Sequence, residues 1–207
     1  MRELGTLVGT GDRVTVDGVA ACVQEHAYLV LHKPAGVVTT MRDPQGRRTI
    51  AELLPKTPRV VPVGRLDYDT SGVLLLTNDG DLANRLLHPR FGVEKVYRAT
   101  IRGRLGAADV TALRTGIDLD DFRAAGVNVR VVAVRREQSV VDVTLHEGRN
   151  RQVRRMFEAV GHPVIVLTRM RFGPIALGAL APGRTRELSQ RERRSLELLG
   201  SVHADGG

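Results

Sequence analysis

The feature that most constrains the fold is a pair of short apolar runs on either side of a largely polar loop. Residues 60–63 (VVPV) and 73–76 (VLLL) are continuously apolar, which is typical of strands buried in a sheet. The loop between them, residues 64–72 (GRLDYDTSG), begins and ends with glycine. We therefore expect a sheet protein whose rigid strands present the side chains of this loop.

Strand and helix signals follow one another irregularly along the rest of the chain. Alternating or continuous apolar runs predict strands at residues 14–16, 28–31, 95–101, 127–134, 140–145 and 164–167. Apolar spacing with caps and stop residues predicts helices at residues 49–54, 107–115, 151–160 and 189–199, and between Asn78 or Asp79 and Pro89. Because strands often follow strands directly, the pattern predicts an α+β fold with a mixed, mostly antiparallel central sheet flanked by helices.

Composition narrows the class of protein. A chain of 207 residues suffices for one sizeable core, or for one domain with a small appendage. The net charge of +8 favours a polyanionic partner such as nucleic acid, although a solvated basic surface would give the same charge. The single cysteine, Cys22, rules out an internal disulfide and fits a reducing compartment. We expect no metal site and no membrane span, because ligand clusters and long apolar runs are missing from the sequence.

Asp67 is the first candidate for chemistry. It lies in the loop between the two apolar runs, with Arg65 two positions before it and Asp69 two positions after it. A carboxylate held there by two strands suits catalysis. The alternative is an ordinary polar turn in which Asp67 caps a backbone N–H. The residues alone leave both interpretations open.

The second candidate is a run of arginines at residues 145–156 (LHEGRNRQVRRM). Arg149, Arg151, Arg154 and Arg155 fall at a predicted strand end and helix start. Cations at a helix N-terminus oppose the helix dipole, so the cluster is more easily understood if it faces phosphates or a carboxylate. The alternative is a solvent-exposed basic helix face.

Four motifs together resemble one branch of a known enzyme family. Residues 64–80 (GRLDYDTSGVLLLTNDG) resemble the central motif of the RsuA/RluB/RluE/RluF branch of pseudouridine synthases. Residues 31–37 (LHKPAGV), 94–97 (EKVY) and 147–156 (EGRNRQVRRM) resemble its other three motifs, in the same order. One departure is His32, which stands where the branch usually has asparagine.

The resemblance implies a role for each matching residue. Asp67 matches the catalytic aspartate, Tyr97 the tyrosine that packs on the target base, and Arg154 the arginine that pairs with the aspartate. Arg65 matches the arginine that fills the space left by the flipped nucleotide, and Leu167 the apolar floor of the uracil pocket. The remaining predicted RNA contacts are Lys33, for which a structural role is the alternative, and Arg149, Arg151 and Arg155.

The resemblance also implies the organisation and activity of the whole chain. Residues 24–200 would form a pseudouridine synthase domain, residues 1–18 a remnant of an N-terminal S4-type RNA-binding domain, and residues 201–207 a disordered tail. The implied reaction converts a uridine of ribosomal RNA, most closely that of the large subunit (23S), to pseudouridine. It needs no cofactor and no metal. We expect a cytoplasmic monomer whose partner is structured ribosomal RNA.

Two other functions remain to be weighed. One is a non-catalytic ribosomal-RNA-binding or assembly factor on the same fold, against which the presence of Asp67, Tyr97 and Arg154 speaks. The other is a glycoside hydrolase that pairs Asp67 with a second carboxylate, Asp69 or Glu147. The positive charge and the clustered arginines fit a polyanion better than a neutral glycan.

Overall fold

The computed structural model describes residue 9, residues 12–20 and residues 25–201. Its central element is a nine-stranded sheet. Seven strands follow the order β13-β3-β5-β11-β6-β10-β9, while β4 pairs with β5 and β12 with β11. Every pairing is antiparallel except that of β5 with β11. The strands are β3 (Tyr28–Lys33), β4 (Val61–Pro62), β5 (Thr70–Thr77), β6 (Lys95–Arg102), β9 (Asn128–Val134), β10 (Gln138–Leu145), β11 (Val164–Phe172), β12 (Ile175–Ala176) and β13 (Thr185–Glu187). The α+β class predicted from the sequence is confirmed.

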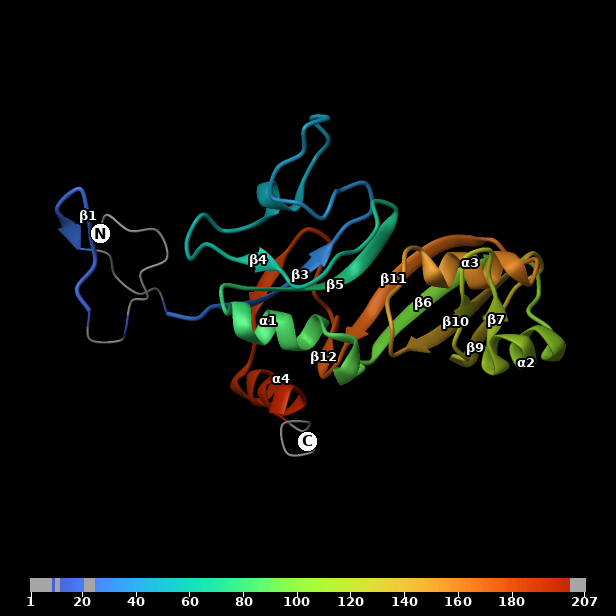
Figure 1. The fold of residues 1–207 in the computed structure, drawn as a ribbon. Helices are drawn as coiled ribbons and strands as arrows, with labels where there is room; N and C mark the ends of the chain where they lie inside the picture. The colour runs from blue at the N-terminus through green and yellow to red at the C-terminus, as the bar shows by residue number, and fades with distance from the viewer. Residues whose placement is uncertain (1–8, 10–11, 21–24, 202–207) are drawn as a thin grey trace.

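Helices cover the sheet in two separate groups (Figure 1). In one half of the molecule, α1 and α4 pack together beside β3 and β5, and in the other half α2 and α3 lie beside β6, β9 and β10. Strand β11 runs from one half into the other. The helices are α1 (Gly80–Leu87), α2 (Ala107–Thr115), α3 (Gln152–Ala159) and α4 (Gln190–Ser201), with short 3-10 turns at η1 (Ile50–Leu53) and η2 (Pro89–Phe91).

Each half has its own apolar core. The α2–α3 half buries residues of β6, β9 and β10 against Met156 and Phe157 of α3. The other half has two cores, one on each face of β3 and β5. The first packs against Leu82 of α1 and Leu196 of α4, and the second against Ile50 of η1. Because successive side chains of a strand point to opposite faces, the apolar run of β5 supplies both cores at once.

The helix boundaries follow from local sequence signals. Asp79 caps α1 by accepting a hydrogen bond from the backbone N–H of Leu82 at 2.9 Å. Ser189 and Glu192 form a capping box at the start of α4, where each side chain accepts a hydrogen bond from the other's backbone N–H. Gly116 follows α2 with a φ of +97°, a conformation that glycine adopts without strain.

Two small two-stranded sheets complete the described fold. Strands β1 (Thr15–Val16) and β2 (Val19–Ala20) pair with each other, and β7 (Ile117–Asp118) pairs with β8 (Arg123–Ala124). Most of the predicted S4-type remnant, residues 1–18, lies outside the described residues, as do residues 202–207 of the predicted tail. Ser201, the first residue of that predicted tail, ends α4 instead.

Two predicted elements need correction. The buried strand predicted at residues 60–63 is only the two-residue β4, in which Val61 is 44% exposed. Pro62 carries no N–H to donate, which limits pairing at this point. The helix predicted at residues 49–54 is the single 3-10 turn η1, which Pro55 follows closely.

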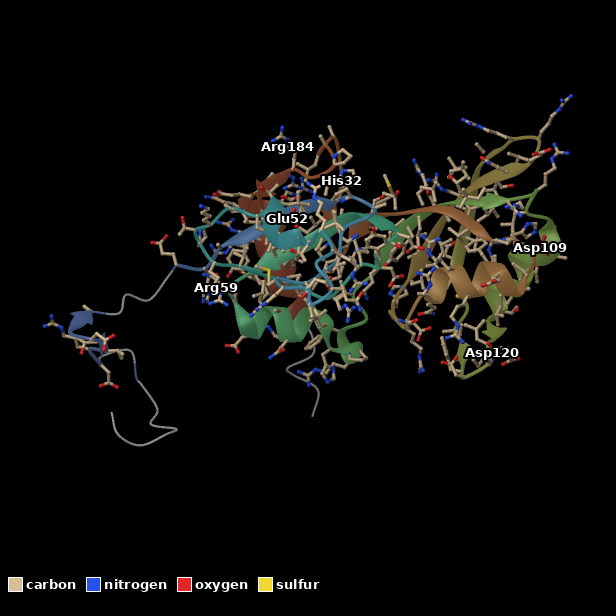
Figure 2. The ribbon with its side chains drawn as sticks, turned by 90° about the horizontal axis from the view of Figure 1, so that it is seen from above. His32, Glu52, Arg59, Asp109, Asp120 and Arg184 are labelled. Carbon is tan, nitrogen blue, oxygen red and sulfur yellow. The ribbon has the colours of Figure 1, made fainter. Side chains whose placement is uncertain are left out.

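His32, the departure from the usual motif, has a structural contact far from the α2–α3 half. Its ring Nδ1 lies 2.7 Å from the backbone oxygen of Leu180, and its backbone N–H donates to Arg184 at 3.0 Å. Figure 2 places His32, Glu52 and Arg184 in one half of the molecule and Asp109 and Asp120 at the far end of the other. His32 therefore connects β3 to the chain segment that precedes β13.

Candidate active site

The loop that carries Asp67 is fixed at several points along its backbone. Thr39 Oγ1 donates to the backbone oxygen of Leu66 at 2.7 Å and accepts from the Leu66 N–H at 3.2 Å. The N–H of Gly36 donates to the backbone oxygen of Tyr68 at 2.7 Å. Leu66 itself is buried in the core beneath the loop. A loop held in this way presents Asp67 in one position, as a reactive carboxylate requires.

Lys33 fixes the same loop from inside the protein. Its Nζ donates to the backbone oxygens of Pro34 at 3.0 Å, Asp67 at 3.0 Å and Thr70 at 2.9 Å. The side chain has 0% exposure, so it does not reach RNA and the predicted RNA contact is corrected to a structural role. Burial lowers the pKa of the Lys33 ammonium to about 8, although the nearby Asp67 and Asp69 carboxylates act in the opposite direction.

The Asp67 side chain remains available to a ligand. Both hydrogen bonds to this residue use its backbone oxygen, which accepts from Lys33 Nζ and from the Thr70 N–H at 3.1 Å. Within the described residues, its half-buried carboxylate has no hydrogen-bond partner. It faces a cavity of about 730 Å³, a volume typical of ligand sites. The alternative of an aspartate that caps a backbone N–H therefore has no support in the contacts.

The cavity gathers residues that lie far apart in sequence. Its walls come from the Asp67 loop, the end of α1 with η2, the start of β6, residues 145–153 and the second half of β11. The predicted site residues that line it are Arg65, Asp67, Tyr97, Arg149, Arg151 and Leu167. The predicted site residues outside its lining are Lys33, Arg154 and Arg155.

Tyr97 and Leu167 form part of the apolar surface of the cavity. Tyr97 lies on β6 and is half-buried, in contact with the cores on both sides of the site. Leu167 lies on β11, paired in register with Ala99 two positions after Tyr97, so both side chains share one face of the sheet. A planar ring beside an apolar floor can hold a base that has left its stack.

Arg154 reaches the Asp67 loop but bonds to a different aspartate from the one expected. Its Nη2 donates to the backbone oxygen of Asp69 at 3.0 Å and lies 3.3 Å from the Asp69 carboxylate. Nη1 donates to the backbone oxygen of Val164 at 3.2 Å. Burial lowers the pKa of the Arg154 guanidinium, and the carboxylates of Asp69 and Asp67 act against that shift. The expected direct pairing of Arg154 with Asp67 is thus corrected to a pairing with Asp69, near Asp67.

Asp69 links this arginine to the rim of the cavity. Arg151 donates two hydrogen bonds of 3.1 Å to the Asp69 carboxylate, in the paired geometry that arginine favours. Burial alone would raise the pKa of Asp69, but the hydrogen bonds from Arg151 and the charge of Arg154 hold it below its ordinary value. Asp69 is therefore an ionised bridge between two arginines, which makes it a poor general acid.

The other predicted RNA contacts differ in their exposure and in the side chains with which they pair. Arg65 is exposed at the cavity. The Arg149 guanidinium lies 4.3 Å from the centre of the Phe122 ring and 3.8 Å from the Glu147 carboxylate. Arg155 forms an ion pair with Asp121 and lies over the same ring, so it lies beside the cavity rather than in it.

Two further cations line the cavity and were missed in the sequence. Lys95, at the start of β6, and Arg169, near the end of β11, both belong to its lining. Arg169 is only 3% exposed. Lys95 was visible as the lysine of the EKVY motif, but nothing local in the sequence distinguishes Arg169 from a solvent-facing strand residue.

The described residues give no sign of a metal-ligand cluster or of a membrane-spanning helix. Within it there is no group of three or more His, Cys, Asp or Glu side chains that could hold a metal ion. None of the helices traced in the structure is both long and apolar enough to cross a membrane.

The sequence and the fold are similar to those of known proteins. The family described as RNA pseudouridylate synthase matches residues 27–159. An uncharacterized RNA pseudouridine synthase of Aquifex aeolicus is 45% identical, covering 95% of this chain and 80% of that protein. Ribosomal large subunit pseudouridine synthase B of Bacillus subtilis is 40% identical, covering 95% of this chain and 82% of its own. A crystal structure of a pseudouridylate synthase superposes with a TM-score of 0.77 at 29% identity, over 92% of this chain and 83% of that one.

Proposed function

Because the chain belongs to the RNA pseudouridylate synthase family, we propose that it isomerises a specific uridine of large-subunit ribosomal RNA, with Asp67 as the catalytic carboxylate. The observation that carries the assignment is the Asp67 carboxylate itself. It has no hydrogen-bond partner among the described residues, lies in a loop fixed by Lys33, and lines a cavity that Tyr97 and Leu167 also line. The similarity to the Bacillus subtilis enzyme, which is named for the large ribosomal subunit, supports the choice of substrate.

The reaction matches what the cavity contains. The C1′–N1 bond of the uridine breaks and its electron pair leaves with N1. The base then turns, C5 bonds to C1′, C5 releases its proton and N1 gains one. No atom or electron is gained overall, so the reaction needs no cofactor. A carboxylate beside C1′ can serve as nucleophile or as base toward the sugar.

The target base must leave the RNA stack to reach Asp67. Tyr97 offers a ring for the extruded uracil, and base–aromatic stacking of this kind contributes about 1–3 kcal/mol. Exposed Arg65 and half-exposed Arg151 lie at the cavity, where the phosphates of the flanking nucleotides would pass. We further propose a monomer that works in the cytoplasm, where ribosomal RNA is assembled.

The rival functions fit the contacts less well. A glycoside hydrolase needs a second carboxyl group with a raised pKa to protonate the leaving group. Asp69 has its pKa lowered instead and is held by two arginines. A non-catalytic RNA-binding protein has no need for a free carboxylate in a fixed loop.

The assignment is tested by Asp67→Asn, which keeps the shape and removes the charge. We expect no pseudouridine from this variant and nearly unchanged RNA binding, while Asp81→Asn, an exposed change on α1, retains activity. Carbodiimide mapping of ribosomal RNA from cells with and without the gene would then locate the target uridine. Comparable activity in Asp67→Asn would reject Asp67 as the catalytic group.

A further inference from the structure

Two cations line the cavity beside one aromatic ring. Lys95 Nζ lies 5.8 Å from the centre of the Phe172 ring, and the Arg169 guanidinium lies 5.3 Å from the same centre. Lys95 pairs in register with Phe172, and Arg169 pairs with Tyr97, across the antiparallel strands β6 and β11. All four residues line the cavity. The two cations therefore lie next to the ring on which we place the target base.

Their hydrogen-bonding capacity is only partly used by the protein. Lys95 Nζ donates to the backbone oxygen of Val93 at 2.9 Å, and Arg169 Nε donates to that of Val73 at 2.7 Å. Arg169 Nη2 is buried without a hydrogen-bond partner. Among the described residues, neither cation forms an ion pair with a carboxylate. Buried donors and charges of this kind are costly unless a ligand completes them.

The position of the two cations favours the base over a phosphate as their partner. The exposed arginines at the cavity, Arg65 and Arg151, are the groups that an RNA backbone would meet first. Arg169, by contrast, is 3% exposed and sits at the level of Tyr97 and Leu167 in the sheet. A flipped base reaches that depth, whereas the phosphates stay with the strand at the surface.

We propose that Lys95 and Arg169 form an anion site for the uracil base, binding its carbonyl oxygens and stabilising the negative charge it acquires when the C1′–N1 bond breaks. This assignment rests on the proposed function and adds a role that Asp67 and Tyr97 do not fill. The electron pair of the broken bond spreads from N1 over both carbonyl oxygens of uracil. It remains on the base until C5 attacks C1′, after which C5 loses its proton and N1 takes one up.

The surroundings suit such a site. Donors that are already fixed where charge develops need no rearrangement during the reaction, and removing one typically slows a reaction by about 10²–10³-fold. Burial lowers the pKa of Lys95 to about 8, and the charge of Arg169 acts in the same direction, while Glu147 opposes it. The ammonium is therefore still mostly protonated at pH 7 and can donate to an oxygen anion.

The test compares two leaving groups in the same RNA. Wild type and Lys95→Gln are given a target RNA that carries either uridine or 5-fluorouridine at the modified position, and loss of that nucleoside is followed in a single turnover. Fluorine withdraws electrons and stabilises the uracil anion without help from the protein. We expect Lys95→Gln to slow the uridine reaction by about 10²–10³-fold and the 5-fluorouridine reaction by a clearly smaller factor.

Controls separate this role from folding and from the proposed function. Lys56→Gln removes the same charge from an exposed position outside the cavity and should slow neither substrate. Arg169→Lys keeps a cation in the buried position and should show the same substrate dependence in a milder form. Equal slowing of both substrates by Lys95→Gln, with wild type active, would overturn the anion site alone. A wild type that converts no uridine would overturn the proposed function, and this assignment with it.

Discussion

Lys33 and Lys95 lie on different strands of one sheet, and the pKa of each is lowered. Their surroundings nevertheless differ. Burial lowers the pKa of each ammonium to about 8. Lys33 has three backbone oxygens around its Nζ, with no exposed surface, whereas Lys95 has one and lines the cavity. A shifted pKa therefore does not by itself distinguish a structural cation from a ligand-binding one. The number of hydrogen bonds that each ammonium group already donates inside the protein does distinguish the two roles.

Replacement of Lys33 should have the largest effect on stability. Lys33→Met removes three hydrogen bonds to backbone oxygens at the base of the Asp67 loop, and only the Asp67 oxygen keeps another donor, the Thr70 N–H. We expect the free energy of unfolding to fall by about 3–5 kcal/mol, as when one partner of a buried charged network is removed. Lys95→Met, which frees a single carbonyl, should cost less than about 1.5 kcal/mol. Urea unfolding measures both.

The exposed Lys56 provides the matched control for this comparison. Lys56→Met should leave the urea midpoint nearly unchanged, because surface substitutions usually stay within about 0.5 kcal/mol. If Lys33→Met and Lys95→Met proved equally destabilising, the distinction drawn from their contacts would be lost.

The same distinction applies to Arg154 and Arg151. Arg154 has an 11% exposed side chain and bonds to Val164 and Asp69, whereas the Arg151 side chain is 44% exposed. We expect Arg154→Ala to lower the free energy of unfolding by about 2–3 kcal/mol. Arg151→Ala should cost under about 1 kcal/mol and act mainly on RNA affinity.

Salt titration separates the two arginines further. Loss of one phosphate contact should reduce the slope of log K against log salt by about 0.7–0.9. We expect that reduction for Arg151→Ala and none for Arg154→Ala, measured by RNA binding over a range of salt concentrations. A reduced slope for Arg154→Ala would place that arginine on the RNA rather than inside the protein.

Alkaline pH should reveal the buried charge of Lys95. Its pKa is about 8 in the folded protein and near 10.5 in the unfolded chain, so between these values the unfolded state binds more protons. Stability contributed by this group therefore rises as pH increases from about 8 to 10.5 and is lost again as pH falls over the same range. We expect wild type to gain about 1 kcal/mol relative to Lys95→Met between pH 7 and pH 10. Urea midpoints of both proteins at the two pH values test this; a constant gap would mean that Lys95 keeps an ordinary pKa.

A similarly small effect should come from a charge remote from the cavity. Glu192 accepts hydrogen bonds from Arg186 and from the backbone of Ser189 at the start of α4, and these lower its pKa to about 2. Its stabilisation is fully present above pH 4.5 and is lost as pH falls toward 2. Glu192→Gln should cost about 1 kcal/mol at pH 7, little at pH 2.5, and nothing in catalytic rate. A slowed reaction with unchanged stability would link α4 to the site.

Local signals in the sequence sufficed for much of the fold and for one side of the site. Neighbouring residues alone indicate the helix caps at Asp79 and Ser189 and the apolar run of β5. The loop with Asp67 was located from the apolar runs on either side of it. Tyr97 and Leu167 were expected at the cavity through the resemblance and do line it.

The remaining features depend on contacts between distant segments. Arg169 is buried because β11 lies against β5 at Gly72, where a Cβ atom would come within 2.2 Å of the Arg169 backbone. The sequence around Arg169 alternates like an ordinary exposed strand, so its burial could not be read locally. The structural role of Lys33, which the sequence left as the alternative to an RNA contact, depends on the same kind of contact, since two of its three partners, Asp67 and Thr70, lie more than thirty positions away.

The parallel pairing of β5 with β11 also determines when during synthesis the protein can become active. Thr70 pairs with Leu167, 97 positions later (167 − 70), and the cavity is closed by Phe172, 105 positions after Asp67 (172 − 67). At about 5–20 residues per second, roughly 5–20 s separate the translation of Asp67 from that of Phe172. During that interval the nascent chain carries the Asp67 loop without the β11 side of the cavity. The complete cavity therefore cannot form before Phe172 has been translated.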